Sequence, residues 1–496
     1  MSNSVCIPLD IYNIEDYHKF IAIKQLPRYS VAGGFAYVPK EYSHLIGKTD
    51  AAKDTTAYTP PSWMFDYQKA ITAMALKKQK YAVFADCGLG KTPIILEFAR
   101  EAARRSSRGK CLIVAPLMVC KQTVAEAEKF YPGENLLQHV TASGLTAWMK
   151  TGTGIAITNY EAITDEIEPA PLDALILDES SMLKSHYGAW GTRLIELGRG
   201  VKYKLCATGT PAPNDRIEYA NHAVFLDAFP TVNSFLARFF VNRGQTNERW
   251  ELKPHALKPF YIALSHWCIF LTNPAVYGWK DNCGTLPPIH VHIENVPLTG
   301  EQRDALMESH GTMFVNEAGG IGSRGKIARI GKGFHAGKKI DSNKTAYIAR
   351  MVRSWPNESV IIWCKYNQEQ EDIAAAIPEA GNISGETPLE EREQIIAGFK
   401  SGKIRVIITK PKILGFGLNL QIATRQVFSG LQDSYEEYYQ AVKRSNRYGS
   451  TKALNVHIPI TELEAPMVQT VMAKAHRVQA DTEQQEKMFY ELASRS

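Results

Sequence analysis

Residues 85–92 combine two glycines with a lysine and a threonine at a spacing that suits a chain of phosphate groups. Gly88 and Gly90 let the backbone curl, so that successive N–H groups converge on an anion. Lys91 can reach the β- and γ-phosphates of a nucleoside triphosphate, and Thr92 can place its hydroxyl on Mg²⁺. These residue types therefore predict a site for a nucleoside triphosphate and Mg²⁺.

The segments on either side of this loop have the patterns that a phosphate-binding loop requires. The apolar residues 81–84 predict a buried strand, and residues 93–99 have a helical pattern. Strand, tight loop and helix is the context of such loops, and the helix N-terminus adds a partial positive charge. Ala85 stands where the usual pattern has its first glycine. The alternative is a glycine-rich turn with an incidental lysine.

A second apolar run, residues 175–177, ends in two adjacent carboxylates, Asp178 and Glu179. A fully buried parallel strand has this form, with the acids at its carboxyl end. Asp178 is placed to hold Mg²⁺ through water, and Glu179 is placed to orient and deprotonate the attacking water. A strand that ends in Asp-Glu is common by chance, but together with residues 85–92 it predicts a nucleoside triphosphatase.

The composition is that of an ordinary globular protein. With 496 residues, 45% hydrophobic and 22% charged, the chain is long enough for about two to four domains. The net charge of +6 permits a polyanionic partner but does not require one. The eight cysteines are scattered singly, which favours buried thiols in a reducing compartment over zinc sites or disulfides. Without an apolar run that spans a bilayer or a signal-peptide pattern, we expect a cytoplasmic protein with no membrane partner.

Two series of alternating strands and helices follow one another, which predicts an α/β fold with parallel sheets in two lobes. The strands of the first lobe are expected at residues 81–85, 111–115, 154–158, 173–178 and 203–207. Those of the second lobe are expected at residues 359–364, 405–409, 426–428 and 454–459. The glycine pair at 33–34 predicts a hairpin near the N-terminus. We also expect a mostly helical region at 212–285 and, at 465–496, a helix that packs back on the core.

With both lobes in view, residues 60–465 resemble superfamily 2 helicases, and among these the Swi/Snf-type translocases of double-stranded DNA, with a compact size that suits a phage or bacterial member. The first lobe carries the motifs in the family's order, at residues 65–68, 85–92, 112–117, 157–161, 178–181 and 207–211. The second lobe carries further motifs at residues 383–385, 391–392, 415–420 and 440–449. The last of these, Gln-Ala-Val-Lys-Arg-Ser-Asn-Arg-Tyr-Gly, is the most specific match. Four positions in these motifs depart from the family pattern: Cys87 stands at a position that is often acidic, Thr123 stands near the place of a Trp, Ser181 replaces a His and Ser450 replaces a Gln.

The resemblance implies two RecA-like lobes with parallel sheets, helical insertions and a small N-terminal accessory domain. The expected domains are residues 1–57 (accessory), 58–228 (ATP-binding lobe), 229–340 (helical insertions and connector), 341–465 (second lobe) and 466–496 (C-terminal helical segment).

The resemblance also implies that the protein is a DNA-dependent ATPase, and it assigns roles to the residues that match the family's motifs. The ATP contacts are expected to be Gln68 (on adenine), Gly88, Gly90, Lys91, Thr92 and Gly417, with Mg²⁺ held by Thr92 and Asp178. The catalytic groups are expected to be Lys91, Glu179 and, as arginine fingers from the second lobe, Arg444 and Arg447. The residues expected to couple the ATP site to the nucleic acid are Thr208, Thr210 and Gln440. The expected DNA contacts within the motifs are Pro116, Thr158, Asn159 and Asn419.

Gln440, Arg444 and Arg447 are spaced by four and three residues, which places them on one side of a helix. The alternative for these three is an exposed helix face with salt bridges. The alternative for Thr208 and Thr210 is a polar segment between a strand and a turn.

Residues 323–339 are the strongest basic stretch of the chain. Because Lys and Arg supply most of the affinity for a DNA backbone, we expect Lys326, Arg329 and Lys332 to contact phosphates. A solvated flexible loop is the alternative.

Four functions fit these patterns. The first is an ATPase that moves on duplex or branched DNA and remodels it, and the second is a strand-separating or branch-migrating helicase. The third is the motor subunit of a restriction or defence complex, which would require a protein partner. The fourth, a catalytically inactive binding module, is disfavoured by the intact ATP-site residues. RNA is a less favoured substrate, because the second-lobe motifs resemble those of DNA translocases.

Overall fold

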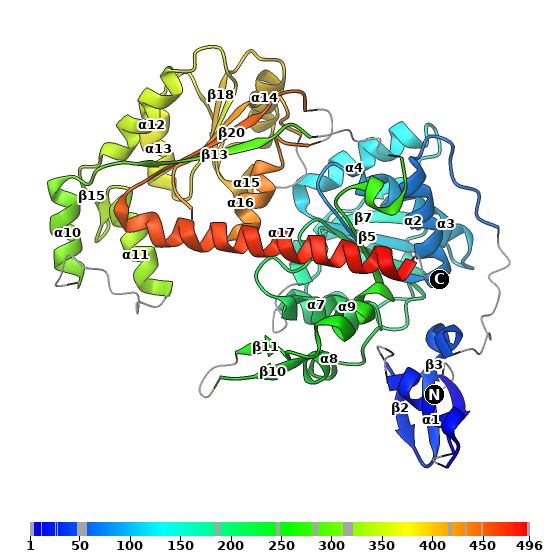
Figure 1. The fold of residues 1–496 in the computed structure, drawn as a ribbon. Coiled ribbons are helices and arrows are strands. Elements are labelled where there is room, and N and C mark those ends of the chain that lie inside the picture. The colour runs from blue at the N-terminus through cyan, green and yellow to red at the C-terminus, as the bar shows by residue number, and fades with distance from the viewer. Residues whose placement is uncertain are drawn as a thin grey trace. The chain divides into compact units, whose positions relative to one another are not determined.

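The computed structural model describes residues 4–10, 12–24, 26, 28–46, 57–183, 189–244, 249–280, 286–310, 321–414, 419–431, 434–447 and 450–493. The chain divides into two compact units. Unit 1 consists of Met1–Asn282 with Asp481–Ser496, and unit 2 of Cys283–Ala480. Figure 1 labels many of their elements. The domain boundaries expected from the sequence stay a prediction.

Unit 1 is built on a seven-stranded sheet in which every pairing is parallel. The strand order is β12-β4-β9-β8-β5-β7-β6. The strands are β4 (Lys80–Ala85), β5 (Cys111–Ala115), β6 (Leu137–His139), β7 (Ile155–Asn159), β8 (Ala174–Asp178), β9 (Tyr203–Thr208) and β12 (Cys268–Leu271). Strands β5, β7, β8 and β9 are buried along their whole length, which explains why they are mainly apolar.

Helices cover this sheet and pack on its apolar core. Of these, α3 begins directly after the phosphate-loop sequence and buries Ile94, Ile95, Leu96 and Phe98. The helices of this part are α2 (Asp66–Lys78), α3 (Lys91–Arg104), α4 (Leu117–Phe130), α5 (Ala142–Thr151), α6 (Ala189–Leu197), α7 (Tyr219–Phe225), α8 (Val232–Phe239) and α9 (Leu257–Ser265). Short 3₁₀ turns are η2 (Tyr160–Ala162), η3 (Ser180–Leu183), η4 (Arg216–Glu218) and η5 (Pro274–Tyr277).

The five strands expected in the first lobe are confirmed with ends within one residue of the prediction, whereas β6 and β12 were not expected. Strand β6 has three residues and no alternating pattern. Strand β12 lies in the region 212–285, which was expected to be helical with loops and also contains a short hairpin, β10 (Phe240–Asn242) with β11 (Trp250–Leu252). Strand β12 pairs with β4, which precedes it by almost two hundred residues, so the local sequence pattern could not reveal this pairing.

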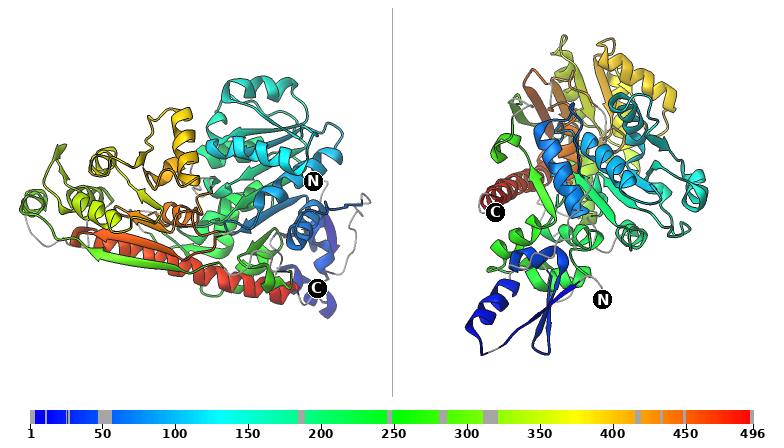
Figure 2. Two further views of the ribbon diagram at one scale, coloured as in Figure 1. Left: turned by 90° about the horizontal axis from the view of Figure 1, so that it is seen from above. Right: turned by 90° about the vertical axis from the view of Figure 1, so that its right-hand side faces the viewer.

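A small antiparallel sheet forms the N-terminal part of unit 1. Its order is β1-β3-β2, and α1 and the 3₁₀ helix η1 pack on one face of it. The elements are β1 (Ser4–Pro8), α1 (Ile14–Lys24), β2 (Ser30–Ala32), β3 (Phe35–Pro39) and η1 (Lys40–Ile46). The hairpin expected at the glycine pair is confirmed, because β2 pairs with β3 across residues 33–34. Arg238 of α8 donates to the carbonyls of Lys24 and Leu26, so this sheet, blue in Figures 1 and 2, is fastened beside α8.

Unit 2 is built on a six-stranded sheet, again with parallel pairings throughout, in the order β13-β20-β19-β16-β18-β17. Its strands are β13 (Ile289–Asn295), β16 (Val360–Trp363), β17 (Gly381–Asn382), β18 (Val406–Thr409), β19 (Arg425–Phe428) and β20 (Leu454–Ile460). The four expected strands of the second lobe are confirmed, and β13 and β17 extend the sheet at its two edges. The prediction of an α/β fold with two parallel sheets is therefore confirmed.

The basic stretch 323–339 is not one loop. Most of it forms the end of a helix and a short hairpin, β14 (Phe334–His335) with β15 (Lys338–Lys339). The helices of unit 2 are α10 (Gly300–His310), α11 (Ile321–Gly331), α12 (Asn343–Arg353), α13 (Asn367–Ala376), α14 (Leu389–Lys400), α15 (Pro411–Leu414) and α16 (Tyr435–Val442), followed by the 3₁₀ turn η6 (Glu462–Glu464).

The expected C-terminal helix is α17 (Ala465–Ala493), the long red helix of Figures 1 and 2. Its first part belongs to unit 2, where Val468 and Val471 join the core. Its last part belongs to unit 1, where the Glu486 carboxylate accepts hydrogen bonds from the backbone N–H and the hydroxyl of Thr272. The expectation that this helix packs on the core is confirmed.

Five of the cysteines lie buried, as expected: Cys111, Cys120, Cys206, Cys268 and Cys364. Cys6 is exposed and Cys87 is half-buried, so the expectation does not hold for these two. Among the helices in the described part of the chain, none is both long and apolar enough to cross a membrane.

Candidate active site

The carboxyl ends of three neighbouring strands meet in the middle of the unit 1 sheet. Strand β4 leads into the phosphate-loop sequence, β8 ends at Asp178 and β9 ends at Thr208. Strand β9 lies between β4 and β8. A Cβ atom added to Gly209 would lie 3.3 Å from the carbonyl oxygen of Ala85, so the chain after β9 passes directly against the start of the loop.

The loop itself has the backbone of an anion cradle. Gly90, the residue before α3, has a φ of 65°, a left-handed conformation that an L side chain rarely adopts. Two side chains of α2 hold it from outside, since the Tyr67 hydroxyl donates to the Leu89 carbonyl at 2.9 Å and the Gln68 amide donates to the Gly90 carbonyl at 3.2 Å. A Cβ on Gly90 would collide with that amide. The loop is therefore held in shape before any ligand binds.

Lys91 lies at the first position of α3, and its ammonium donates to the Ala85 carbonyl at 3.0 Å. Burial acts to lower its pKa, but the neighbouring groups Cys87, Glu179, Asp178 and Asp86 outweigh burial and raise the pKa overall. The lysine is therefore a fixed positive charge at the strand ends.

Asp178 and Glu179 lie side by side at the end of β8, and the Glu179 N–H donates to the Asp178 carboxylate at 3.0 Å. Burial and then the adjacent Glu179 raise the pKa of Asp178 to about 7, against the opposing effect of Lys91. Glu179 has a φ of 52°, which is strained for a residue with a side chain. Two crowded carboxylates with one lysine nearby are suited to a further cation.

Thr208 joins the carboxylates to the turn after β9. Its hydroxyl donates to the Glu179 carboxylate at 3.2 Å and accepts from the Thr210 N–H at 3.2 Å. The Thr210 hydroxyl is buried and has no hydrogen-bond partner among the described residues. Of the two threonines expected to couple the ATP site to the nucleic acid, Thr208 thus contacts Glu179 directly and Thr210 contacts Thr208.

The donor set fits ATP and Mg²⁺. The cradle around Gly90 supplies backbone N–H groups, Lys91 supplies a positive charge, and Thr92 is half-buried in the first turn of α3. The Asp178 carboxylate, whose pKa lies far above its usual range, is a group that a bound cation stabilises in its charged form. Gln68 is used differently from the expectation, because its carbonyl accepts from the Phe65 N–H and its amide holds Gly90. A contact with adenine stays a prediction.

The sequence did not predict the residues that hold the turn after β8, which carries Asp178 and Glu179. The Tyr160 hydroxyl donates to the Asp178 carbonyl at 2.8 Å. His222 of α7 lies 3.1 Å from the Ser180 hydroxyl through Nε2, and its Nδ1 lies 3.4 Å from the Glu218 carbonyl. Burial lowers the pKa of His222 to about 4, so the imidazole is neutral. A single histidine within an apolar helix gives no sign of which strand end it meets.

The buried His222 predicts a loss of stability in acid. Its pKa of about 4 in the fold lies below the ordinary 6.5, so the unfolded chain takes up the proton first as the pH falls. His222 therefore leaves the free energy of unfolding unchanged above pH 6.5. Between pH 6.5 and pH 4 it lowers the free energy of unfolding, by at most about 3 kcal/mol. Thermal unfolding midpoints at pH 7 and pH 5 should differ less for His222→Leu than for wild type. A His139→Leu control, at an exposed site, should keep the full difference; equal differences in all three proteins would contradict the prediction.

Of the DNA contacts expected in the first lobe, the structure contradicts Thr158. Its side chain is fully buried and its hydroxyl donates to the Val140 carbonyl at 2.8 Å. Asn159 is also largely buried and donates to the Glu161 carboxylate at 2.8 Å. Pro116, half-buried before α4, remains accessible. The motif pattern located the strand ends correctly. It could not tell which side chains near these ends are buried and bonded inside the protein and which are accessible to a ligand.

In unit 2, Gln440 lies in α16 and its amide donates to the Glu436 carboxylate at 3.4 Å. The helix ends at Val442, so the expectation of one helix face that includes Arg444 and Arg447 is wrong. Both arginines follow in turns, in which the Arg444 N–H donates to the Ala441 carbonyl. Arg444 is buried and Arg447 is half-buried, and their role as arginine fingers stays a prediction.

Gly417 lies outside the described residues. Asn419, the second residue expected from the same motif, is among the described residues and is exposed.

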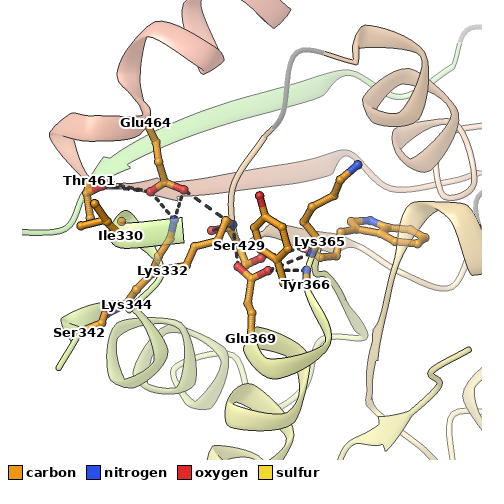
Figure 3. Close-up of polar contacts among 12 residues, drawn as sticks. Ile330, Lys332, Ser342, Lys344, Lys365, Tyr366, Glu369, Ser429, Thr461 and Glu464 are labelled. Atoms are coloured by element: carbon orange, nitrogen blue, oxygen red, sulfur yellow. Dashed lines mark hydrogen bonds and ion pairs between the residues drawn. The ribbon is translucent and has the colours of Figure 1, made fainter. Parts of the chain in front are cut away.

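The structure contradicts Lys332 as a phosphate contact. Its side chain is 1% exposed, and its ammonium donates to the Glu369 carboxylate at 2.6 Å and to the Ser429 carbonyl at 3.1 Å. Figure 3 shows this ammonium between the Glu369 and Glu464 carboxylates. Burial acts to lower the pKa of Lys332, but the two carboxylates raise it overall. Lys332 is a buried structural cation.

A second lysine completes this buried network. Lys344 donates to both oxygens of Glu464, at 2.7 and 2.5 Å (Figure 3). Burial lowers the pKa of Lys344 to about 8, and the pKa of Glu369 falls to about 2 because the attraction of Lys332 outweighs the opposing effect of burial. The network ties residues from three distant segments to the end of β19.

The other two residues of the basic stretch, Lys326 and Arg329, are exposed on α11. The Arg329 guanidinium lies over the ring of Tyr366, 5.2 Å from its centroid. These two remain available to an anionic partner.

Comparison with known proteins agrees with this geometry. Residues 63–344 match the profile of the SNF2-related domain, and residues 343–449 match that of the helicase conserved C-terminal domain. Together the two matches cover both parallel sheets apart from the last strand, β20.

Three relatives show how far the similarity extends. Protein p41 of Acyrthosiphon pisum secondary endosymbiont phage 1 is 24% identical over 412 residues, which are 76% of this chain and 87% of the relative. The DNA annealing helicase and endonuclease ZRANB3 of Bos taurus is 23% identical over 79% of this chain and 38% of its own length. The ATP-dependent helicase fft1 of Schizosaccharomyces pombe is 27% identical over 78% and 49%. The chain thus spans less than half the length of the latter two relatives.

The SNF2-related match alone covers more than half of the chain, and it includes the strand ends at which Lys91, Asp178, Glu179 and Thr208 converge. The helicase C-terminal match adds the second parallel sheet. The chain therefore belongs to the SNF2-related family, the Swi/Snf-type superfamily 2 helicases, and is a DNA-dependent ATPase of that family.

Proposed function

We propose that this protein hydrolyses ATP in order to move along duplex or branched DNA and to remodel it. The observation that carries the proposal is the convergence of Lys91, Asp178, Glu179 and Thr208 at one edge of the unit 1 sheet. A cation, two carboxylates and a hydroxyl at one strand edge are the groups that enzymes of phosphoryl transfer use, which supports the proposal.

The chain's own groups divide the work. The backbone N–H groups around Gly90 bind phosphate oxygens, and Lys91 stabilises the negative charge that spreads over the transferred phosphoryl group. Glu179, held by Thr208, orients the attacking water and accepts its proton. Thr92 and Asp178 would hold Mg²⁺, which when bound neutralises part of the phosphate charge.

DNA would bind mainly through its backbone, to the exposed groups of unit 2 that the motif pattern and the basic stretch identify: Lys326, Arg329 and Asn419. ZRANB3 is named a DNA annealing helicase and fft1 an ATP-dependent helicase. Both names are consistent with the proposal that this protein moves on DNA. The endonuclease activity in the name of ZRANB3 is not proposed here, because this chain spans only 38% of that protein.

Steady-state ATPase activity tests the proposal directly. We would assay the protein alone, with linear duplex DNA, with single-stranded DNA, with a branched junction and with RNA, at several salt concentrations. Because affinity for the DNA backbone falls steeply with salt, a single salt concentration could hide a real stimulation.

Strong stimulation by plain duplex supports movement on duplex DNA. Stimulation mainly by junctions or single strands favours the strand-separating or branch-migrating alternative. Stimulation by RNA alone, or turnover that no polynucleotide changes, contradicts the proposal and leaves a protein partner as the source of activation.

A further inference from the structure

The turn that carries Asp178 and Glu179 departs from relaxed backbone geometry. Glu179 has a φ of 52°, a conformation that costs a residue with a side chain about 1 kcal/mol or more. Such a conformation persists only where the surroundings hold it. The groups that fasten the turn on both sides therefore decide where the Glu179 carboxylate lies.

Two fastenings come from one short helix. In α7, the Asn221 side-chain amide donates to the Leu183 carbonyl at 2.6 Å, at the end of η3. The next residue, His222, meets the Ser180 hydroxyl at 3.1 Å, at the start of η3. Both ends of the turn that follows Glu179 are thus bound to α7.

The hydrogen-bond directions at His222 can be read from its surroundings. The ring is neutral, and its Nδ1 faces the Glu218 carbonyl, which can only accept. The proton is therefore on Nδ1, and Nε2 accepts from the Ser180 hydroxyl. The ring also meets Phe84 of β4 edge-on, with centroids 5.3 Å apart, so it is held in one orientation beside the strand that leads into the phosphate loop.

We propose that His222 is a positioning residue for ATP hydrolysis, which acts through Ser180 to hold Glu179 against Thr208. Its side chain is fully buried, so it acts on the reacting groups only through other residues, and it is not one of the motif residues. The inference rests on the proposed function, because it takes Glu179 as the group that activates water. Loss of the Ser180 contact would let the strained turn relax and carry the carboxylate away from its place.

The expected result is a change in turnover without a change in nucleotide affinity. A misplacement of about 1 Å at a reacting group can cost about 10²-fold in rate, so we expect His222→Leu and Ser180→Ala each to lower kcat by about 10- to 100-fold. The KM for ATP should change by less than about threefold, because the phosphate loop is intact. The double variant should lose no more than the worse single variant, since both remove the same contact. His222→Gln, whose amide oxygen can accept in place of Nε2, should recover much of kcat.

Val224→Ala is the matched control for destabilisation. Val224 is buried two residues further along α7 and makes no polar contact with the turn. Its variant should lower the thermal unfolding midpoint as much as His222→Leu or more, yet keep kcat. If His222→Leu does not fold, Ser180→Ala and His222→Gln carry the test alone.

A folded His222→Leu with wild-type kcat overturns the inference, and so does a double variant whose loss is the product of the two single losses. Lys91→Ala and Glu179→Gln, assayed in parallel, test the proposed function itself. Turnover that survives in those two variants contradicts the assignment of the site. Turnover lost there but kept in His222→Leu contradicts only the positioning role.

Discussion

Lys91→Ala should reduce ATP turnover with duplex DNA by about 10²- to 10³-fold or more, the loss seen when one preorganised group that stabilises transition-state charge is removed. In the structure this ammonium is already anchored to the Ala85 carbonyl, next to two carboxylates. Alanine keeps the helix α3, because it favours helix, and removes only the charge. ATPase assays at saturating nucleotide check the result.

A matched control separates chemistry from charge and fold. Lys77 is exposed on α2, and Lys77→Ala should leave kcat and the thermal unfolding midpoint unchanged. Lys91→Ala should also melt within a few degrees of wild type, since the carboxylates it leaves can take up a proton or a cation. A Lys91→Ala protein that hydrolyses ATP within tenfold of wild type would contradict the assignment of the phosphate loop.

Lys332→Met should have the largest effect on stability. The change removes the cation between Glu369 and Glu464, and the remaining buried carboxylates are left with Lys344 alone. Breaking a buried ion pair by removal of one partner costs about 3–5 kcal/mol. The thermal unfolding midpoint should therefore fall by about 10 °C or more, as followed by circular dichroism or calorimetry.

Lys326→Met is the control, because Lys326 lies six residues earlier in the same basic stretch and is exposed. It should leave the unfolding midpoint unchanged and reduce the slope of log affinity for DNA against log salt by about 1. Adding Glu369→Gln to Lys332→Met should recover part of the stability, since it removes one of the unpaired charges. A stable Lys332→Met protein with a reduced salt slope would restore the original expectation of a phosphate contact.

Much of the fold follows from local pattern. The strands β4, β5, β7, β8 and β9 are mainly apolar segments bounded by glycine, proline or polar residues, and a strand buried on both faces requires a mainly apolar sequence. The phosphate loop is equally local, because a left-handed Gly90 followed by Lys and Thr at a helix start needs only neighbours in the chain. The four edge strands β6, β12, β13 and β17 were not predicted, because what makes each of them a strand is pairing with a partner in the sheet.

Within the site, the sequence by itself determined which strand ends carry chemistry, namely residues 85–92, 178–179 and 208–210. It did not determine which side chains near those ends face inward. Thr158 and Lys332 match a motif or a charge pattern, yet burial and hydrogen bonds inside the protein occupy both. His222 matches nothing, yet it meets Ser180 directly. The type of a residue and its spacing from others in the sequence indicate what chemistry it can perform. Its burial and its hydrogen-bond partners depend on distant segments that only the folded chain brings together.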